Sequence, residues 1–305
     1  MDKTNLETKS KIIAALVILT FGTIGIVTHF IPLSSAVIVF YRAFFGAILV
    51  YLYMLIKGQK VNIKSIKDNL PVLILTGFYM GLNWVFSFES YKIASVSVAT
   101  VCYNTMPIFV VMISPLMFED KLTRKGMFCI FLAAIGILFV SNVLNAKVSS
   151  EQLLGVVYGL LAAIFYALVV LYNKKLKHIT TNDKILFQFI FSAIIMLIYV
   201  MLIEKSSFVF GNGVSLNDKR IGLLMLILLV VVHTAVCYIS YFEAILYIKP
   251  ETIAILTYLD PMCAIVLSFF ILGERMTFLQ VIGAVLILVS TLINEFGFVK
   301  KRLGK

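Results

Sequence analysis

The chain has 305 residues, of which 61% are hydrophobic and 13% are charged, and its mean hydropathy is +1.04. Soluble domains carry about 25% charged and about 45–50% apolar residues, so this composition excludes an ordinary soluble protein and indicates a polytopic membrane protein. The net charge of +11 does not predict a nucleic-acid partner, because the cations lie between apolar segments and no basic helix with interleaved aromatic residues stands apart from them.

Ten apolar segments follow one another along the chain, each close to the roughly 20 residues that cross a bilayer as a helix. We expect membrane-spanning helices over 11–31, 34–56, 70–91, 96–118, 124–142, 152–173, 184–203, 221–247, 252–272 and 278–297. The connections are short, apart from the polar stretch 204–220. No small-residue cleavage site follows the first segment, which is therefore expected to be a retained helix.

Lys and Arg residues are distributed unevenly over the connections. With a cytoplasmic N-terminus, 19 of the 26 cations fall on the cytoplasmic side, six fall in outer loops, and Arg42 lies inside a span. Cytoplasmic loops of membrane proteins are enriched in Lys and Arg. We therefore expect a multi-pass protein of the cytoplasmic membrane with both termini in the cytoplasm.

One stretch of the chain occurs twice. Residues 107–123 return at 261–277, a constant 154 positions later. This predicts two repeats of five helices each, residues 1–148 and 149–305. Because five is odd, equivalent helices cross the membrane in opposite directions. Such inverted repeats are typical of secondary transporters, which open alternately to either side of a central site.

Ionisable side chains are rare inside the predicted spans, and each is a functional candidate because a charge at the bilayer centre is costly. Arg42 and Asp260 each lie about 12 Å into a core of about 30 Å, so they share a depth near the midplane. Arg42 is a candidate contact for an anionic substrate group, with a snorkelling or structurally paired arginine as the alternative. Asp260 is a candidate for substrate or proton contact, with capping of the backbone before Pro261 as the alternative. His233 is equally compatible with polar packing and with a cavity lining.

Pro107 and Pro261 occupy equivalent positions in the two repeats, and a proline within a span removes one helical hydrogen bond and kinks the helix. Aromatic and amide side chains at similar depth are candidate substrate contacts: Tyr79, Asn83, Trp84, Tyr103, Asn104, Tyr166, Tyr238 and Tyr258. The alternative for the two asparagines is an interhelical hydrogen bond. The alternative for the aromatic residues is plain packing.

No metal site or cofactor is expected, because the four cysteines lie singly in apolar segments and form no CxxC pair. The sequence contains no HExxH or GxSxG motif and no paired inward carboxylates, which argues against an intramembrane enzyme. Gly77–Gly81 and Gly155–Gly159 form GxxxG motifs. We expect these to pack helices within one chain rather than between chains, and we expect a monomer.

The segment YFEAILYIKPETIAILTYLDPMCAIVLSFFILGERMT (241–277) resembles the second repeat of the EamA family in the drug/metabolite transporter superfamily. The likeness runs through Pro261, the Gly273-Glu274-Arg275 turn and Gly283, while the first repeat, with YRAFFGAILV at 41–50, fits less closely. The first repeat departs from the family pattern at residues 118–121, which read Phe-Glu-Asp-Lys where the family usually has Gly-Glu-Arg.

The resemblance implies a ten-helix inverted-repeat transporter of small metabolites, often an exporter of amino acids. It also implies a central cavity lined by spans 1–4 and 6–9, with spans 5 and 10 peripheral, and Arg42 matches a commonly basic position of the family. The small multidrug-resistance relatives use a glutamate in their first span, whereas residues 11–31 contain no acidic residue. Proton-coupled export of cationic drugs by that chemistry is therefore disfavoured.

Together these features predict an all-α membrane protein that is not an enzyme and that exports a small metabolite, such as an amino acid, by alternating access. Arg42 or a helix end would meet a carboxylate, Asp260 would meet an amine or exchange a proton, and aromatic side chains would hold an apolar part. Three alternatives stay open: a flippase for a lipid-linked molecule, an intramembrane enzyme built around His233 and Asp260, and a sensor or structural subunit.

Overall fold

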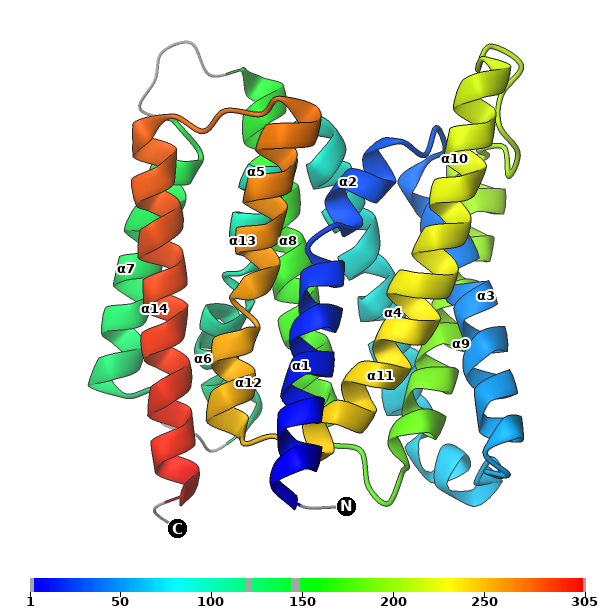
Figure 1. Cartoon of the computed structure of the whole chain (residues 1–305), viewed down its shortest axis with the longest axis horizontal. Coiled ribbons are helices and arrows are strands. Elements are labelled where there is room, and N and C mark those ends of the chain that lie inside the picture. The colour runs from blue at the N-terminus through cyan, green and yellow to red at the C-terminus, as the bar shows by residue number, and fades with distance from the viewer. Residues whose placement is uncertain (1–2, 119–121, 144–148, 304–305) are drawn as a thin grey trace.

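The computed structural model describes residues 3–118, 122–143 and 149–303, and all regular secondary structure in these residues is helical. Figure 1 shows an upright bundle in which the first helix begins and the last helix ends on the same side. The first half of the chain forms α1 (Lys3–Phe21), α2 (Ile24–His29), α3 (Ser35–Ile56), α4 (Ile63–Ile93), α5 (Val96–Tyr103), α6 (Met106–Met117) and α7 (Arg124–Val140).

The second half contains α-helices interrupted by short segments of other helix types. Its α-helices are α8 (Ser150–Asn173), α9 (Thr181–Tyr199), α10 (Leu216–Leu228), α11 (Cys237–Ala244), α12 (Pro250–Leu256), α13 (Leu259–Leu267) and α14 (Phe278–Leu303). The π-helical segments are η1 (Val200–Glu204), η2 (Leu229–Val236) and η4 (Ser268–Leu272), and η3 (Ile245–Tyr247) is a 3-10 turn. The largest departures from the expected ranges are at two helix starts, since α1 begins at Lys3 rather than at residue 11 and α4 begins at Ile63 rather than at residue 70.

Among the residues that the structure describes, seven helical segments are long and apolar enough to cross a membrane: Leu6–His29, Ser35–Ile56, Ile63–Ile93, Val96–Met117, Ser150–Asn173, Thr181–Glu204 and Leu216–Tyr247. Leu259–Leu272 and Phe278–Asn294 are shorter apolar helices. The described residues therefore have the architecture of a multi-pass membrane protein, and the count of ten spans stays a prediction.

The helix starts follow from local sequence. A serine, threonine or asparagine side chain accepts a backbone N–H of the first turn in eight of the described helices, at Ser34, Asn62, Ser95, Thr123, Ser149, Thr180, Ser215 and Thr277. Each cap satisfies an N–H that has no partner inside its helix and typically contributes about 1 kcal/mol. These polar residues at the ends of the apolar runs are what delimit the helices.

Two helix breaks occupy equivalent places in the two halves. The chain is interrupted between α5 and α6 next to Pro107, and between α12 and α13 next to Pro261. Proline has no N–H to donate to the residue four positions earlier. In the second break the carbonyl four positions before Pro261 is that of Thr257. It accepts the N–H of Asp260 at 3.3 Å instead. Each break leaves a helix start in the interior of the bundle.

Two further irregularities have no counterpart in the other half and were not predicted. The first is the break between α1 and α2 at Gly22–Thr23, and the second is η2 in the middle of the α10–α11 segment. A Cβ atom at Gly22 would lie 2.6 Å from the backbone oxygen of Asp260 and 2.8 Å from Cβ of Cys263. Glycine therefore lets the α1–α2 break pack directly on the start of α13.

The GxxxG glycines lie at close contacts between helices of this chain. A Cβ atom at Gly77, Gly81, Gly155 or Gly159 would lie between 2.6 and 2.9 Å from an atom of a neighbouring segment. The first pair faces α9, and the second pair faces the α4–α5 region. The prediction that these motifs pack helices within the chain is confirmed.

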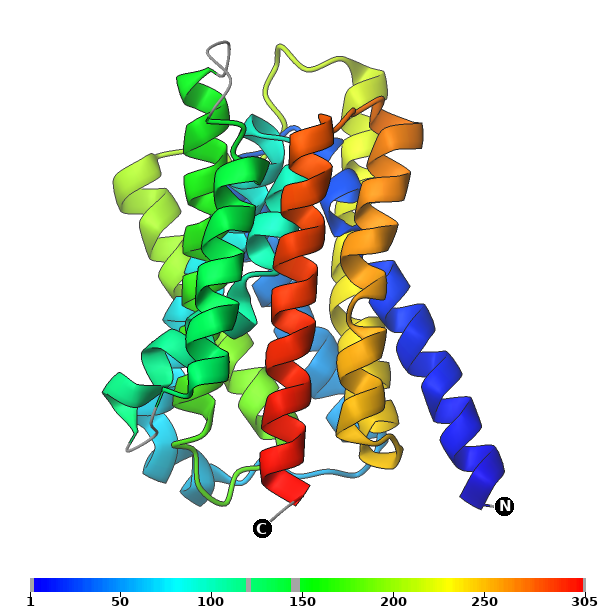
Figure 2. The same ribbon diagram turned by 90° about the vertical axis from the view of Figure 1, so that its left-hand side faces the viewer.

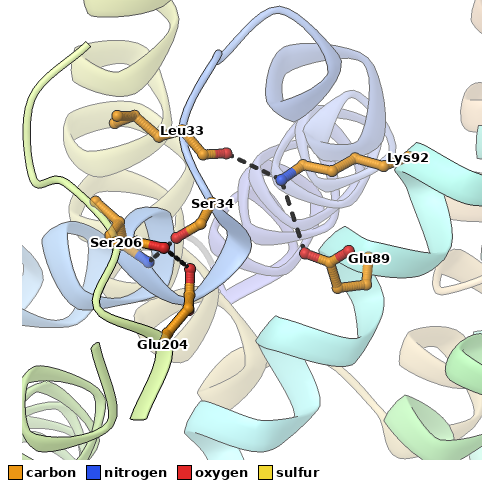
Figure 3. A network of polar contacts seen from close by, with 7 residues as sticks. Leu33, Ser34, Glu89, Lys92, Glu204 and Ser206 are labelled. Atoms are coloured by element: carbon orange, nitrogen blue, oxygen red, sulfur yellow. Dashed lines mark hydrogen bonds and ion pairs between the residues drawn. The ribbon is translucent and has the colours of Figure 1, made fainter. Parts of the chain in front are cut away.

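The two ends of the bundle differ. Figure 2 shows α1 leaning away from the other helices toward its N-terminal end. At the opposite end, Lys92 Nζ donates to the backbone oxygen of Leu33 at 3.0 Å and lies 3.8 Å from Glu89 Oε1 (Figure 3). Ser206 donates to Glu204 close to the same connection (Figure 3). The Lys92 hydrogen bond to Leu33 joins the connection between α2 and α3 to the end of α4.

Candidate functional site

A cavity of about 240 Å³ lies within the bundle, bordered by α1, α2, α3, α4, α5, α6, α8, α11 and α13 and by the break between α12 and α13. Eight of the eleven predicted contact residues line it: Arg42, Asn83, Trp84, Tyr103, Asn104, Tyr166, Tyr238 and Asp260. Among the described residues, α7 and α14 contribute no side chain to the lining, and neither does α9, although the family resemblance implied that this seventh span would line the cavity. The cavity thus collects polar and aromatic side chains from both halves of the chain.

Arg42 points its guanidinium into this cavity from α3. The residue is 3% exposed, its Nε donates to Thr234 Oγ1 at 3.0 Å, and its Cζ lies 4.1 Å from the centre of the Trp84 ring. A cation over an indole face is stabilised by about 0.5–2 kcal/mol, and by more as water is excluded. The hydrogen bond and the stacked ring fix the guanidinium from two directions, while its Nη groups have no hydrogen bond to any residue that the structure describes.

Asp260 reaches the cavity from the first turn of α13, directly after the break next to Pro261. A carboxylate at a helix N-terminus is favoured by the helix dipole and by the N–H groups that lack a partner there. Within the described part of the chain, the carboxylate has neither an ion pair nor a side-chain hydrogen bond. The helix break therefore places the Asp260 carboxylate at the cavity without a charged partner among the described residues.

The two opposite charges share the cavity without forming an ion pair, as far as the described residues go. Burial of a charge away from water is costly unless a partner compensates it. In this chain Arg42 is compensated by Trp84 and Thr234 rather than by Asp260. The arrangement can accommodate one positive and one negative group of a bound molecule.

The two asparagines differ in the use of their amide groups. Asn83 is 1% exposed, and its Nδ2 donates to the backbone oxygen of Ala162 in α8 at 2.8 Å. This is the interhelical bond given above as its alternative role, although Asn83 also borders the cavity. Asn104 follows the last residue of α5 and donates to the Thr100 oxygen at 2.8 Å. Its amide oxygen is the group of Asn104 that can face a ligand.

Aromatic rings form much of the remaining wall. Tyr103 and Tyr166 have ring centres 5.9 Å apart, and Tyr238 meets Phe21 edge to face at 5.8 Å. Phe88 also lies near the Arg42 guanidinium, with its ring centre 5.8 Å from Cζ. Such rings offer apolar faces together with phenolic hydroxyl groups.

Three predicted contact residues do not line the cavity. Tyr79 packs between α4 and α8, with ring centres 6.0 Å from Phe165 and 5.6 Å from Tyr172. His233 is 1% exposed, and its Nε2 lies 2.7 Å from Thr23 Oγ1, so it serves as a polar packing residue between η2 and the α1–α2 break. Tyr258 lies in the break between α12 and α13, outside the lining.

Several residues of the cavity lining were not predicted from the sequence, although the helical period and the internal repeat both point to them. From Trp84, the helical spacings of three, four and seven residues lead to Ser87, Phe88 and Tyr91, all in the lining. From Tyr238, the same spacing leads to Tyr241 and Phe242. The repeat offers the second signal, because five pairs of lining residues are each 154 positions apart: Trp84 and Tyr238, Ser87 and Tyr241, Phe88 and Phe242, Tyr103 and Thr257, and Met106 and Asp260.

The described residues contain no group of three or more His, Cys, Asp or Glu side chains that could hold a metal ion. The four cysteines are free thiols, and Cys102, Cys129 and Cys237 are buried. The functional groups of the site are therefore the two charges, the amides and the aromatic rings.

Comparison with known proteins assigns the chain to a family. The model of the EamA-like transporter family matches residues 8–142 and again residues 153–295. An uncharacterized transporter of Bacillus subtilis is 26% identical over 94% of this chain and 90% of its own length. A probable amino-acid metabolite efflux pump of Escherichia coli is 26% identical over 76% of this chain and 79% of its own length.

A crystal structure that shares 13% sequence identity covers 94% of this chain and 97% of its own, with a TM-score of 0.61, and so has the same fold. The two family matches together span most of the sequence, one in each half. The chain therefore belongs to the EamA-like transporter family.

Proposed function

We propose that this protein is a secondary transporter that exports a small zwitterionic metabolite of the amino-acid class by alternating access. The observation that carries the proposal is the presence of Arg42 and Asp260 in one cavity without an ion pair between them. A zwitterion has the two charges needed to compensate both groups at once. Its carboxylate meets the Nη groups of Arg42, where a bidentate contact is possible, and its ammonium group meets Asp260.

The size and wall of the cavity favour a small molecule with an apolar part. About 240 Å³ lies below the roughly 300–1,000 Å³ that drug-sized ligands occupy. A molecule with a lipid anchor needs more room than this, which favours a metabolite over the flippase alternative. The rings of Trp84, Tyr103, Tyr166 and Tyr238 are the surfaces against which an apolar side chain of the substrate packs.

The repeat supports alternating access. We infer ten spans arranged as two inverted five-helix repeats, residues 1–148 and 149–305, in the cytoplasmic membrane with both termini in the cytoplasm. The five lining pairs spaced by 154 positions support a pseudo-two-fold axis through the cavity, since equivalent residues meet there from both halves. Inverted repeats can exchange conformations and so expose one central site to either side in turn.

The substrate class and the direction of transport draw further support from a relative, whose name describes a probable amino-acid metabolite efflux pump. A proton is the proposed coupled ion, because Asp260 is the acidic group that the described cavity lining contains. Proton binding to its carboxylate releases an ammonium group from the site, and this links substrate release to the pH gradient.

Reconstitution into liposomes tests the proposal. Liposomes that contain the purified protein are incubated with each of a panel of labelled amino acids, with and without a pH gradient across the membrane. At least one amino acid should cross by saturable transport, and Arg42→Gln should slow that transport at least tenfold, since a hydrogen-bonded charge is worth about 1.5–3 kcal/mol. Absence of transport for the whole panel, or an Arg42→Gln variant as fast as wild type, contradicts the proposal. Scrambling of labelled lipids by the same liposomes would favour the flippase.

A further inference from the structure

Thr234 is the hydrogen-bond partner of Arg42 within the described part of the chain. Its hydroxyl oxygen accepts the N–H of Arg42 Nε at 3.0 Å, and both side chains are buried. The same hydroxyl donates to the backbone oxygen of Leu229 at 2.9 Å. Because its proton is directed to Leu229, the oxygen keeps its lone pairs for Arg42 and acts as a fixed acceptor.

The π-helical segment η2 makes this geometry possible. In an α-helix a threonine hydroxyl reaches the carbonyl three or four residues earlier. In η2 the Thr234 hydroxyl reaches the carbonyl five residues earlier, and Nδ1 of His233 lies 3.1 Å from the oxygen of Leu228, also five residues earlier. The wider turn directs two consecutive side chains to different segments, so that His233 meets Thr23 in the α1–α2 break and Thr234 meets Arg42 in α3. Short π-helical segments inside α-helices are frequent at functional sites.

The approach of α3 to η2 depends on Gly46, which lies one helical turn after Arg42. A Cβ atom at Gly46 would be 2.9 Å from Cγ2 of Thr234 and 3.0 Å from Cδ2 of Phe189. A side chain there would push the two segments apart and lengthen the contact between Arg42 and Thr234. Gly46 and η2 together thus allow the short contact between Arg42 and Thr234.

We propose that Thr234 is a positioning residue for Arg42. By holding Nε, it directs the two Nη groups of the guanidinium toward the cavity and keeps the guanidinium plane over Trp84. The inference rests on the proposed function, in which those Nη groups bind the substrate carboxylate. Without the hydroxyl, the long arginine side chain regains rotational freedom, and the charge is no longer held in the geometry that binding needs.

The fluorescence of Trp84 tests the position of Arg42 without a substrate, because the chain contains a single tryptophan and its ring lies 4.1 Å from the guanidinium carbon. Thr234→Val replaces the hydroxyl with a methyl group of similar size, and Thr234→Ala removes it. Both should change the emission of the purified protein in the direction of the change that Arg42→Met produces. Thr234→Ser keeps the hydroxyl and should retain the wild-type emission. Circular dichroism checks that each variant is folded.

Two further measurements separate positioning from a general structural effect. In the Arg42→Met background, where no guanidinium is present, Thr234→Val should cause no additional change in Trp84 emission. For an amino acid that the wild type transports, Thr234→Val should raise KM about tenfold, which is the low end for loss of a hydrogen bond to a charged group, with little change in maximal rate. Thr234→Ser should restore the wild-type KM.

Wild-type emission in both Thr234→Val and Thr234→Ala would overturn the inference, as would an equal emission change in the Arg42→Met background. Loss of the folded state in both removal variants assigns Thr234 a structural role and overturns it as well. If emission changes as expected but Arg42→Met transports amino acids with wild-type KM and rate, the positioning role stands. In that case it is the proposed function that fails.

Discussion

Glu274 accepts the backbone N–H of Val96 at 2.8 Å, and so a turn of the second half caps a helix of the first. The same carboxylate accepts the N–H of Ser97 at 3.1 Å and the hydroxyl of Ser97 at 3.2 Å. Glu274 stands in the turn between η4 and α14, while Val96 begins α5, the helix that carries Tyr103 to the cavity. The repeat places Pro250 at the position equivalent to Val96, and proline has no N–H to offer such a cap.

Glu274→Gln should destabilise the protein by about 1–3 kcal/mol, because a neutral amide replaces a charged acceptor and turns one N–H group toward the N–H of Ser97. The measurement is the free energy of unfolding in detergent, followed by circular dichroism. Arg275→Gln is the matched control, since the neighbouring Arg275 is exposed. Equal stability of the two variants would show that the cap contributes nothing.

The crossing of α7 and α14 depends on two glycines. A Cβ atom at Gly283 would lie 2.6 Å from the backbone oxygen of Gly136, and one at Gly136 would lie 2.8 Å from the oxygen of Gly283. Because backbone atoms cannot move aside as a side chain can, Gly283→Val should destabilise the protein by about 1–3 kcal/mol or more. The unfolding midpoint in detergent measures the effect.

The control for this substitution is Gly211→Ala, at a position where an added Cβ meets nothing within 4 Å. Its unfolding midpoint should equal that of the wild type. If Gly283→Val is just as stable, the two helices do not cross as closely in the membrane as they do in this structure.

What the sequence predicted well is what local chemistry decides. Approximate helix bounds follow from the length of the apolar runs, and the kinks expected next to Pro107 and Pro261 follow from the missing N–H of proline. The α1–α2 break could not be predicted in this way. It contains Thr23, whose partner His233 lies 210 positions away, and no local window contains both residues.

In the candidate site, too, local sequence predicts some features, whereas contacts between distant helices decide others. Depth along a helix can be counted from its end, so Arg42 and Asp260 could be placed at one level from the sequence. Rotation about the helix axis depends on the neighbouring helices, and depth alone does not reveal it. Tyr79 therefore faces Phe165 and Tyr172 in α8, while Trp84 on the same helix faces the cavity. Counting the helical period outward from Trp84 would have corrected this.

The orientation in the membrane can be tested by cysteine labelling of intact cells. The connection between η1 and α10 lies at the end of the bundle opposite to the termini, whereas the connection between α3 and α4 lies at the same end as the termini (Figure 1). With both termini in the cytoplasm, Gly211→Cys should react with a membrane-impermeant maleimide and Gln59→Cys should react only after the cells are opened. Both residues are exposed. The reverse pattern would place the termini outside.

Asp260 can be tested by separating its charge from its shape. Asp260→Asn keeps the size of the side chain but cannot compensate an ammonium group or carry a proton, so amino-acid transport should fall at least tenfold and should no longer respond to a pH gradient. Asp260→Glu keeps the charge, and because the longer side chain still reaches into the cavity from the same helix start, it should retain part of the transport rate. Asp68→Asn, on the exposed face of α4, is the control that should transport as the wild type does. If Asp260→Asn transports at the wild-type rate and with the wild-type response to pH, the negative charge of the cavity takes no part in the cycle, and a zwitterionic substrate loses its main support.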